Sequence, residues 1–484
     1  MKLNNPELLR SQCLINGEWC DALSGQREAV INPATGAELA SIPLVSEEET
    51  QQAIAAAQRA QSEWKQLTAK QRSALLLAWA DKVLAAQEDL AQLMTAEQGK
   101  SLAEARGEVA YAASFITWFA EEAKRVDGAV LQAPQASQRL VVVKQPIGVC
   151  AAITPWNFPA AMITRKVAPA LAAGCAIIVK PAEQTPLTAL ALAKLAQDAG
   201  IPAGVLQMVT GEAAQVGKVL CDSPVVRKLS FTGSTEVGRI LMAQCAPSIK
   251  KLSLELGGNA PVIVFDDANL DAAVAGIMAS KFRNSGQTCV CANRIYVQDG
   301  IYERLAEKLV AAVEQLKVGD GSQEGTTQGP LIDSDAVAKV QSHIDDALIK
   351  GAQIATGGQP HALGGTFFQP TVVTGVTQKM RFAKEETFGP VAPLFRFHDE
   401  AEAIAMANDT EFGLAAYLFT QNAARQWRVP EALEYGIVGI NTGLISNEVA
   451  PFGGVKQSGL GREGSRYGIE EYLELKYLCI DVSR

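Results

Sequence analysis

The chain has 484 residues, enough for two or three domains, and its 48% hydrophobic and 20% charged residues are typical of a globular protein and exclude intrinsic disorder. Its 43 Lys and Arg against 52 Asp and Glu give a net charge of −9, so a general basic surface for nucleic acid or an anionic membrane is missing. The longest apolar run, 168–179, is interrupted by Pro169 and Gly174 and is shorter than the ~18 residues that a membrane span needs. We therefore expect neither a nucleic-acid partner nor a membrane.

Nine cysteines without a regular framework, in a chain that starts with a polar segment, predict free thiols in a reducing compartment and a cytoplasmic location.

Helices are predicted over 46–124, because Ser46 and the three glutamates after it offer an N-cap and an acidic first turn, and apolar residues then recur every three to four positions. From residue 148 short apolar runs alternate with helix-length amphipathic segments. The five runs are 148–154, 175–180, 204–210, 226–231 and 252–256. This alternation predicts an α/β fold with a doubly wound parallel sheet and a ligand at the carboxyl ends of its strands.

A second alternating stretch begins at 261–265 and continues through 294–297, a helix at 301–316 and 438–441, which predicts a second α/β domain. Segments 126–146 and 472–482 resemble strands but belong to neither of the two alternating strand-helix stretches. Strands of this kind commonly pair with another subunit, so we expect a homo-oligomer, either a dimer or a tetramer.

Two glycine motifs and the histidines do not support other enzyme classes. The segment from Gly459 to Gly464 matches the dinucleotide pattern G-x-G-x-x-G but follows a loop, and 211–218 has five residues between its glycines where a phosphate loop needs four. The three histidines are expected in polar or loop-like surroundings, without the spacing of a zinc site or a hydrolase. We therefore expect no metal.

Three residues are candidates for chemistry, each with a plain structural alternative. Cys289 lies in a glycine-rich turn where backbone N–H groups can stabilise a thiolate, or it is a small buried hydrophobe. Glu255 ends the fifth strand among apolar neighbours, where burial would raise its pKa towards that of a general base, or it is a capping or ion-paired residue. Asn157 follows the first strand in a bend with two prolines and can donate to an oxyanion, or it forms an Asx-turn.

Two further strand ends suit a dinucleotide. Lys180 and Glu183 follow the second strand, where a cofactor ribose would lie. Gly233 and Ser234 precede a helix whose N-terminal N–H groups can receive a pyrophosphate.

Taken together, these segments resemble the NAD(P)-dependent aldehyde dehydrogenases over nearly the whole chain. The resemblance rests on motifs that occur in order: Pro155-Trp-Asn-Phe-Pro, Lys180-Pro-Ala-Glu, Phe231-Thr-Gly-Ser, Glu255-Leu-Gly-Gly, Gly286-Gln-Thr-Cys, Glu385-Glu-Thr-Phe-Gly-Pro and Pro451-Phe-Gly-Gly. It implies that Cys289 is the nucleophile, Glu255 the general base and Asn157 the oxyanion donor. It also implies a set of cofactor-binding residues: Thr154, Pro155, Trp156, Lys180, Glu183, Gly233, Ser234, Leu256, Glu386 and Phe388.

The resemblance also implies a division of the chain: 1–125 with 147–258 as a dinucleotide-binding domain, 259–470 as a catalytic domain, and 126–146 with 471–484 as an oligomerisation element. Within the family the chain is most similar to succinate-semialdehyde and glutarate-semialdehyde dehydrogenases. That similarity implies that Arg165, Arg283, Ser446 and Phe452 bind the substrate, the arginines and the hydroxyl holding its far carboxylate. Without the family context Arg165 would be interpreted as a surface helix residue.

The expected reaction is the oxidation of succinate semialdehyde to succinate through a cysteine thioester. Glutarate semialdehyde is the alternative substrate. A coenzyme A-acylating dehydrogenase is a less favoured function, because such an enzyme would not need Glu255. A catalytically silent binding protein is also less favoured, because all three catalytic residues are present. NAD is expected to be preferred over NADP, because the Glu183 carboxylate can accept hydrogen bonds from a ribose 2′-OH and repels a 2′-phosphate. Cys291 is expected to be regulatory, trapping an oxidised Cys289 as a disulfide, with simple packing as its alternative.

Overall fold

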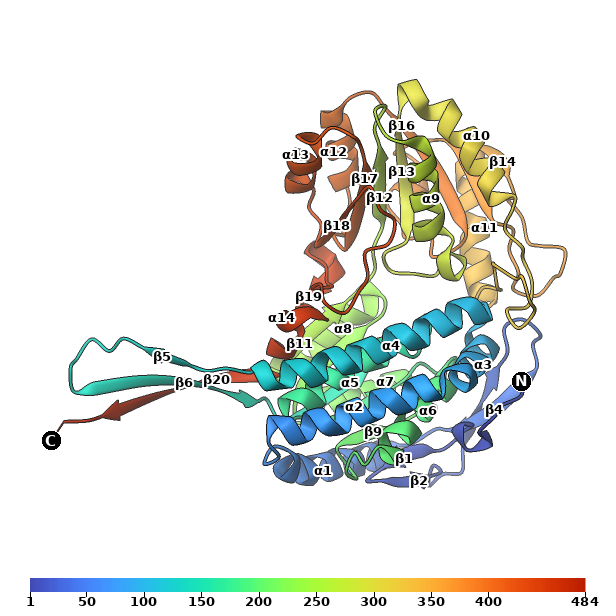
Figure 1. Ribbon diagram of the computed structural model, residues 1–484. Coiled ribbons are helices and arrows are strands. Elements are labelled where there is room, and N and C mark those ends of the chain that lie inside the picture. The colour runs from blue at the N-terminus through green and yellow to red at the C-terminus, as the bar shows by residue number, and fades with distance from the viewer. Residues whose placement is uncertain (484) are drawn as a thin grey trace.

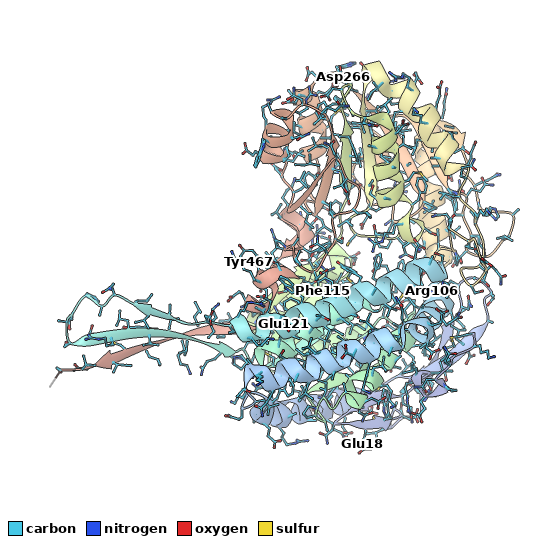
Figure 2. All side chains as sticks on the ribbon, in the orientation of Figure 1. Glu18, Arg106, Phe115, Glu121, Asp266 and Tyr467 are labelled. Carbon is cyan, nitrogen blue, oxygen red and sulfur yellow. The ribbon has the colours of Figure 1, made fainter. Side chains whose placement is uncertain are left out.

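The computed structural model describes residues 1–483, which form two globular parts and a projecting arm (Figure 1). The first part is built on a sheet with strand order β19-β11-β10-β7-β8-β9-β1-β2. Its five central strands are parallel, and β19, β1 and β2 join them at the two edges in antiparallel pairs. The strands are β1 (Cys13–Ile15), β2 (Glu18–Cys20), β7 (Val149–Ile153), β8 (Ala176–Lys180), β9 (Leu206–Met208), β10 (Val226–Thr232), β11 (Lys251–Glu255) and β19 (Gly459–Leu460).

Helices cover both faces of this sheet because its strands are apolar on both sides. In β7, Cys150 and Ala152 belong to the core shared with α2–α6, whereas Val149 and Ala151 belong to the core shared with α1, α7 and α8. The helices are α1 (Glu47–Trp64), α2 (Ala69–Ala85), α3 (Gln87–Gln98), α4 (Leu102–Glu122), α5 (Ala161–Ala173), α6 (Pro186–Asp198), α7 (Ala213–Asp222) and α8 (Thr235–Cys245).

The second part repeats this plan around a sheet with strand order β14-β15-β16-β13-β12-β17-β18, in which β14 alone is antiparallel to its neighbour. The strands are β12 (Ala260–Val264), β13 (Ala292–Gln298), β14 (Gln353–Thr356), β15 (Thr371–Val376), β16 (Val391–Phe397), β17 (Ala415–Phe419) and β18 (Ile437–Ile440). Its helices are α9 (Leu270–Lys281), α10 (Tyr302–Val313), α11 (Ser334–Ile349), α12 (Glu400–Asn408), α13 (Arg425–Ala432) and, between the two parts, α14 (Ser465–Glu470).

The arm is a three-stranded antiparallel sheet of β5 (Ala129–Leu131), β6 (Gln138–Pro146) and β20 (Leu473–Asp481), and it extends away from both parts (Figure 1). Segments 126–146 and 472–482 are thus strands outside both large sheets, as their sequences indicate. The arm exposes apolar side chains, among them Val130, Leu131, Leu475, Tyr477 and Ile480.

Two features differ from the sequence-based expectations. The predicted 259–470 segment does not stay within the second part, because β19 pairs with β11, Gly459 opposite Glu255, and so completes the first sheet. The N-terminal strands β1 and β2, and the hairpin of β3 (Arg27–Ile31) and β4 (Glu38–Pro43), were not predicted, since such short edge strands have little periodicity.

No helix in the described part of the chain is long and apolar enough to cross a membrane. All nine cysteines are free thiols.

Candidate active site

The site lies where the strand order of the first sheet reverses. From β7 the chain adds β8 and β9 on one side and then β10 and β11 on the other, which leaves a crevice at the carboxyl ends of β7 and β10. A cavity of about 290 Å³ occupies this crevice. Nine predicted site residues line it: Pro155, Trp156, Asn157, Gly233, Ser234, Leu256, Cys289, Glu386 and Phe388.

The turn after β10 has the features of a phosphate site. Ser234 lines the cavity and caps α8 by accepting a hydrogen bond from the Val237 N–H at 3.3 Å. The first N–H groups of a helix lack intrahelical partners and favour an anion. A Cβ on Gly233 would come within 2.4 Å of the Phe231 ring, so only glycine lets the backbone pass here. These residues fit the pyrophosphate of a dinucleotide.

Three predicted cofactor residues lie beside this cavity and do not line it. Lys180, at the end of β8, is buried and pairs with the partly exposed Glu183, while the Thr154 N–H donates to the Lys180 carbonyl oxygen at 3.1 Å. Glu183 lines a second cavity, of about 530 Å³, which shares Ile332 and Asp333 with the first. A dinucleotide of extended shape would have to reach both cavities.

Glu386 and Phe388 approach the crevice from the loop before β16. Glu386 Oε1 accepts a hydrogen bond from the Gly258 N–H at 3.2 Å, and burial raises the pKa of its carboxyl to about 7. Phe388 has a left-handed backbone (φ 56°), and its ring meets Trp156 edge-on with centroids 5.6 Å apart. The two aromatic rings thus join the loops of the two parts.

Cys289 follows a tightly folded loop. Asn284, Ser285 and Gly286 all have positive φ, and a Cβ on Gly286 would lie 2.1 Å from the Gly389 carbonyl oxygen. The thiol faces the cavity and is partly exposed. Burial nevertheless raises the pKa of the Cys289 thiol to about 12, since desolvation and the carboxylates outweigh Arg165 and the backbone N–H. The backbone N–H does lower the pKa of the thiol, as expected of the turn, but its effect is smaller than that of burial.

Glu255 is a buried carboxyl group of the kind expected of a general base. It is buried at the end of β11, neither carboxyl oxygen has a hydrogen-bond partner among the described residues, and burial raises its pKa well above the usual range. A capping or ion-paired glutamate would have such partners, so that interpretation is wrong. Glu255 does not line the cavity, and its Oε1 lies against the backbone of Gly453.

Asn157 is buried in the bend after β7, and its Nδ2 donates to the Gln287 carbonyl oxygen at 3.1 Å. This contact links the oxyanion-donor candidate directly to the loop that holds Cys289.

Arg165, on α5, is 2% exposed, so the surface interpretation of this residue is wrong. Its guanidinium forms an ion pair with the buried Glu463 and stacks on the Phe452 ring, 4.2 Å from the centroid. Arg165 Nη2 has no hydrogen-bond partner among the described residues. Arg165 does not line the cavity, but its charge lowers the pKa of the Cys289 thiol against the effect of burial.

Arg283 and Ser446 lie outside the cavity lining. The Arg283 guanidinium stacks on Phe158 at 4.8 Å, directly before the strained loop, and Ser446 is half-buried in the segment after β18. Their binding of substrate stays a prediction.

A family model described as the aldehyde dehydrogenase family matches residues 19–478. The chain belongs to this family. It is 65% identical to a succinate-semialdehyde dehydrogenase of Escherichia coli (strain K12) whose name specifies NADP(+), over 99% of this chain and all of the relative. It is 64% identical to a glutarate-semialdehyde dehydrogenase of Pseudomonas putida, with full coverage of both chains. A solved structure of succinate-semialdehyde dehydrogenase from Burkholderia pseudomallei is 63% identical, with full coverage of both and a TM-score of 0.99.

The aldehyde dehydrogenase fold and NAD(P)-dependent oxidation through a cysteine are thereby established for this chain. The enzyme's Cys291 is buried outside the cavity, its Sγ 3.3 Å from Lys281 Nζ and 3.5 Å from the Lys281 carbonyl oxygen. These contacts match the packing alternative, and the regulatory role stays a prediction.

The sequence did not single out Lys339, which lines the cavity, or Tyr111, on which the charges of two predicted substrate-binding arginines act. Lys339 on α11 lines the cavity and lowers the pKa of Glu386 against the effect of burial. The Tyr111 hydroxyl is buried without a partner among the described residues, and the charges of Arg165 and Arg283 act on it. Both occupy amphipathic helices, where nothing in the sequence separates them from ordinary helical residues. His343, expected in polar surroundings, is fully buried and contacts Thr387.

Proposed function

We propose that the enzyme oxidises a semialdehyde that bears a distal carboxylate, with succinate semialdehyde converted to succinate. The observation that supports this most is Arg165, a buried cation whose Nη2 has no hydrogen-bond partner among the described residues and whose charge acts on the Cys289 thiol. An uncharged aldehyde would leave this donor unsatisfied, which costs free energy in a buried site. A substrate carboxylate would satisfy it with a charge-assisted hydrogen bond.

In the proposed mechanism, the Cys289 thiol gives its proton to solvent, its sulfur attacks the aldehyde carbon, and the resulting oxyanion receives hydrogen bonds from Asn157 Nδ2 and the Cys289 N–H. A nicotinamide dinucleotide, held at Ser234 and Glu386, supplies a hydride acceptor when bound. Loss of hydride leaves a thioester on Cys289. Glu255 then takes a proton from water, whose oxygen attacks the thioester carbon and releases the dicarboxylate. A coenzyme A-acylating enzyme would not need this base.

Substrate length is the open choice within this proposal, since relatives of nearly equal identity are named for the four-carbon and the five-carbon semialdehyde. One methylene in a pocket changes kcat/KM by only about 10–200-fold. Measuring kcat/KM for succinate and glutarate semialdehydes, each with NAD and NADP, tests the proposal, and an equal or higher value for an uncharged aldehyde of the same length would refute it.

Replacing Arg165 or Arg283 with alanine should lower kcat/KM for succinate semialdehyde far more than for butyraldehyde. Loss of one charge-assisted hydrogen bond costs about 1.5–3 kcal/mol, which corresponds to roughly 10–150-fold. Arg165→Ala also removes an ion-pair partner of Glu463, so melting temperatures must accompany the kinetics. Arg283→Ala is the cleaner variant, because Arg283 forms no ion pair within the described residues 1–483. Equal losses on the two aldehydes would show that the arginines are structural.

NAD is proposed to be the preferred cofactor. Glu183 pairs with Lys180, which neutralises the nearby cation that a 2′-phosphate would otherwise contact. The name of the Escherichia coli relative specifies NADP(+), so the Glu183 position makes a sharp test. Glu183→Ser should free Lys180 and shift the ratio of kcat/KM values towards NADP. A wild-type preference for NADP, or an unchanged ratio in the variant, would contradict the argument.

Cys291 is proposed to protect Cys289 by forming a disulfide after oxidation, which requires its thiol to leave Lys281. Peroxide should then inactivate the enzyme, dithiothreitol should restore activity, and Cys291→Ala should make the loss largely irreversible. Equal recovery of the variant, or no linkage between residues 289 and 291 by mass spectrometry, would leave Cys291 as a packing residue.

The arm is proposed to join subunits into a dimer or tetramer, because its exposed apolar strands offer unpaired edges to a second copy. A cytoplasmic location is proposed from the nine free thiols, which suit a reducing compartment.

A further inference from the structure

A fully buried ion pair lies at the start of α4, next to the active site. The side chains of Lys100 and Glu108 are each 1% exposed, and Lys100 Nζ donates to Glu108 Oε2. Removing two charges from water costs several kcal/mol per ion unless further hydrogen bonds satisfy them. We therefore consider which groups form the further hydrogen bonds of this pair.

Lys100 is directed at Asn157. Its Nζ donates to the Asn157 main-chain carbonyl oxygen at 2.7 Å and lies 4.1 Å from the centroid of the Phe158 ring. Asn284, in the strained loop before Cys289, donates to the same carbonyl through Nδ2 at 3.0 Å. The peptide that follows the Asn157 side chain is thus held by one charged and one neutral donor.

Glu108 contacts the main chain of the same segment a few residues later. Its Oε1 accepts hydrogen bonds from the N–H groups of Ala160 and Ala161, at 2.9 and 3.2 Å, where α5 begins. A carboxylate is favourable at a helix N-terminus, where these N–H groups otherwise lack partners. The pair therefore forms hydrogen bonds at both ends of the bend, to Asn157 and to Ala160.

The start of α4 also contacts the loop of the nucleophile. Glu104 Oε1 accepts a hydrogen bond from the Asn284 N–H at 2.7 Å. One helix end thereby contacts both segments that must converge on the aldehyde oxygen, the bend of Asn157 and the loop of Cys289.

We propose that Lys100 and Glu108 are positioning residues for the reaction, which hold the Asn157 amide where the oxyanion forms. Neither touches the substrate; each acts through the main chain of 157–161. This inference rests on the proposed role of Asn157 as oxyanion donor. Donors of this kind act only when they are held in place beforehand, and a misplacement of about 1 Å can cost roughly 100-fold in rate.

The test is a double-mutant cycle between Lys100→Met and Asn157→Ala, measured as kcat/KM and as the rate of the pre-steady-state burst of reduced cofactor. In the enzyme that retains Asn157, Lys100→Met should lower both kcat/KM and the burst rate by about 10–100-fold. In the Asn157→Ala background the same change should have less than about a twofold effect, because the donor that Lys100 positions is gone. A purely structural role would lower the melting temperature and reduce the rate equally in both backgrounds, and that result would overturn the proposal.

Lys228→Met is the matched control. Lys228 is also a fully buried lysine, but its side chain is hydrogen-bonded to Ser253 and lies 3.7 Å from Glu471, which belong to neither the bend nor the loop. It should lower the melting temperature without showing coupling to Asn157. If Lys100→Met does not fold, Glu108→Gln is used in the same cycle, because it keeps an acceptor for Ala160 and removes the charge.

Running the cycle with succinate semialdehyde and with butyraldehyde separates this proposal from the substrate assignment. The coupling to Asn157 should be the same for both aldehydes, since the oxyanion is common to them. If the arginine variants lowered kcat/KM equally for both aldehydes while the coupling to Asn157 persisted, only the substrate assignment would be overturned. An Asn157→Ala enzyme as fast as the wild type would overturn the positioning role.

Discussion

Replacing Cys289 with alanine should abolish aldehyde oxidation, with kcat falling by more than about 10⁴-fold, because no thioester can form without the sulfur. Cofactor binding should persist, since the dinucleotide's candidate contacts at Ser234, Glu183 and Glu386 are unchanged. The measurements are the initial rate of NAD(P)H formation and the dissociation constant of the cofactor by titration calorimetry.

Cys291→Ala is the matched control for this variant, because it removes a thiol two residues away that does not line the cavity. Its turnover under reducing conditions should stay within about twofold of the wild type, as expected for a residue outside the reacting groups. Steady-state turnover in the Cys289→Ala enzyme at the wild-type rate would refute the assignment of the nucleophile.

Replacing Glu255 with glutamine should separate the two halves of the reaction. The amide keeps the shape of the side chain but cannot take a proton from water, so thioester hydrolysis should slow by about 10²–10⁴-fold. Hydride transfer should still occur once, and rapid mixing should show a burst of reduced cofactor close to one per active site, followed by slow turnover. A variant that turns over rapidly without a burst would show that another group activates the water.

The pH dependence of hydrolysis provides an independent check on Glu255. Its ionised form is the base, and burial raises its pKa well above 4.5, so the base is lost as the pH falls through that raised value. Wild-type deacylation should therefore rise with pH through the range in which a solvated glutamate is already fully ionised. Glu255→Gln should lack this rise in the slow phase. A wild-type rate that is flat down to about pH 5 would show that the working carboxyl is solvated.

Much of the fold follows from local pattern. The five predicted strands of the first sheet correspond to β7–β11 within two residues at every end, because buried parallel strands are short apolar runs separated by amphipathic helices. The functional motifs follow those strands directly, so their convergence at one sheet edge was predictable from the order of elements. By contrast, β19 is two residues long and could be recognised only by its pairing with β11.

The fold class, the family and the residue types at the strand ends can be predicted from the sequence, because they depend on periodicity and on motifs of a few neighbouring positions. The burial and charge environment of those residues arises only when the chain folds. Arg165 is a buried cation because Glu463, far along the chain, and Phe452 surround it, and the thiol of Cys289 has a raised pKa because several distant segments exclude water from it. The role of the Lys100–Glu108 pair likewise could not be predicted from the sequence, since its partners at 157–161 lie about fifty residues away along the chain. Burial and charge pairing depend on which surfaces meet in space, and no local pattern records that.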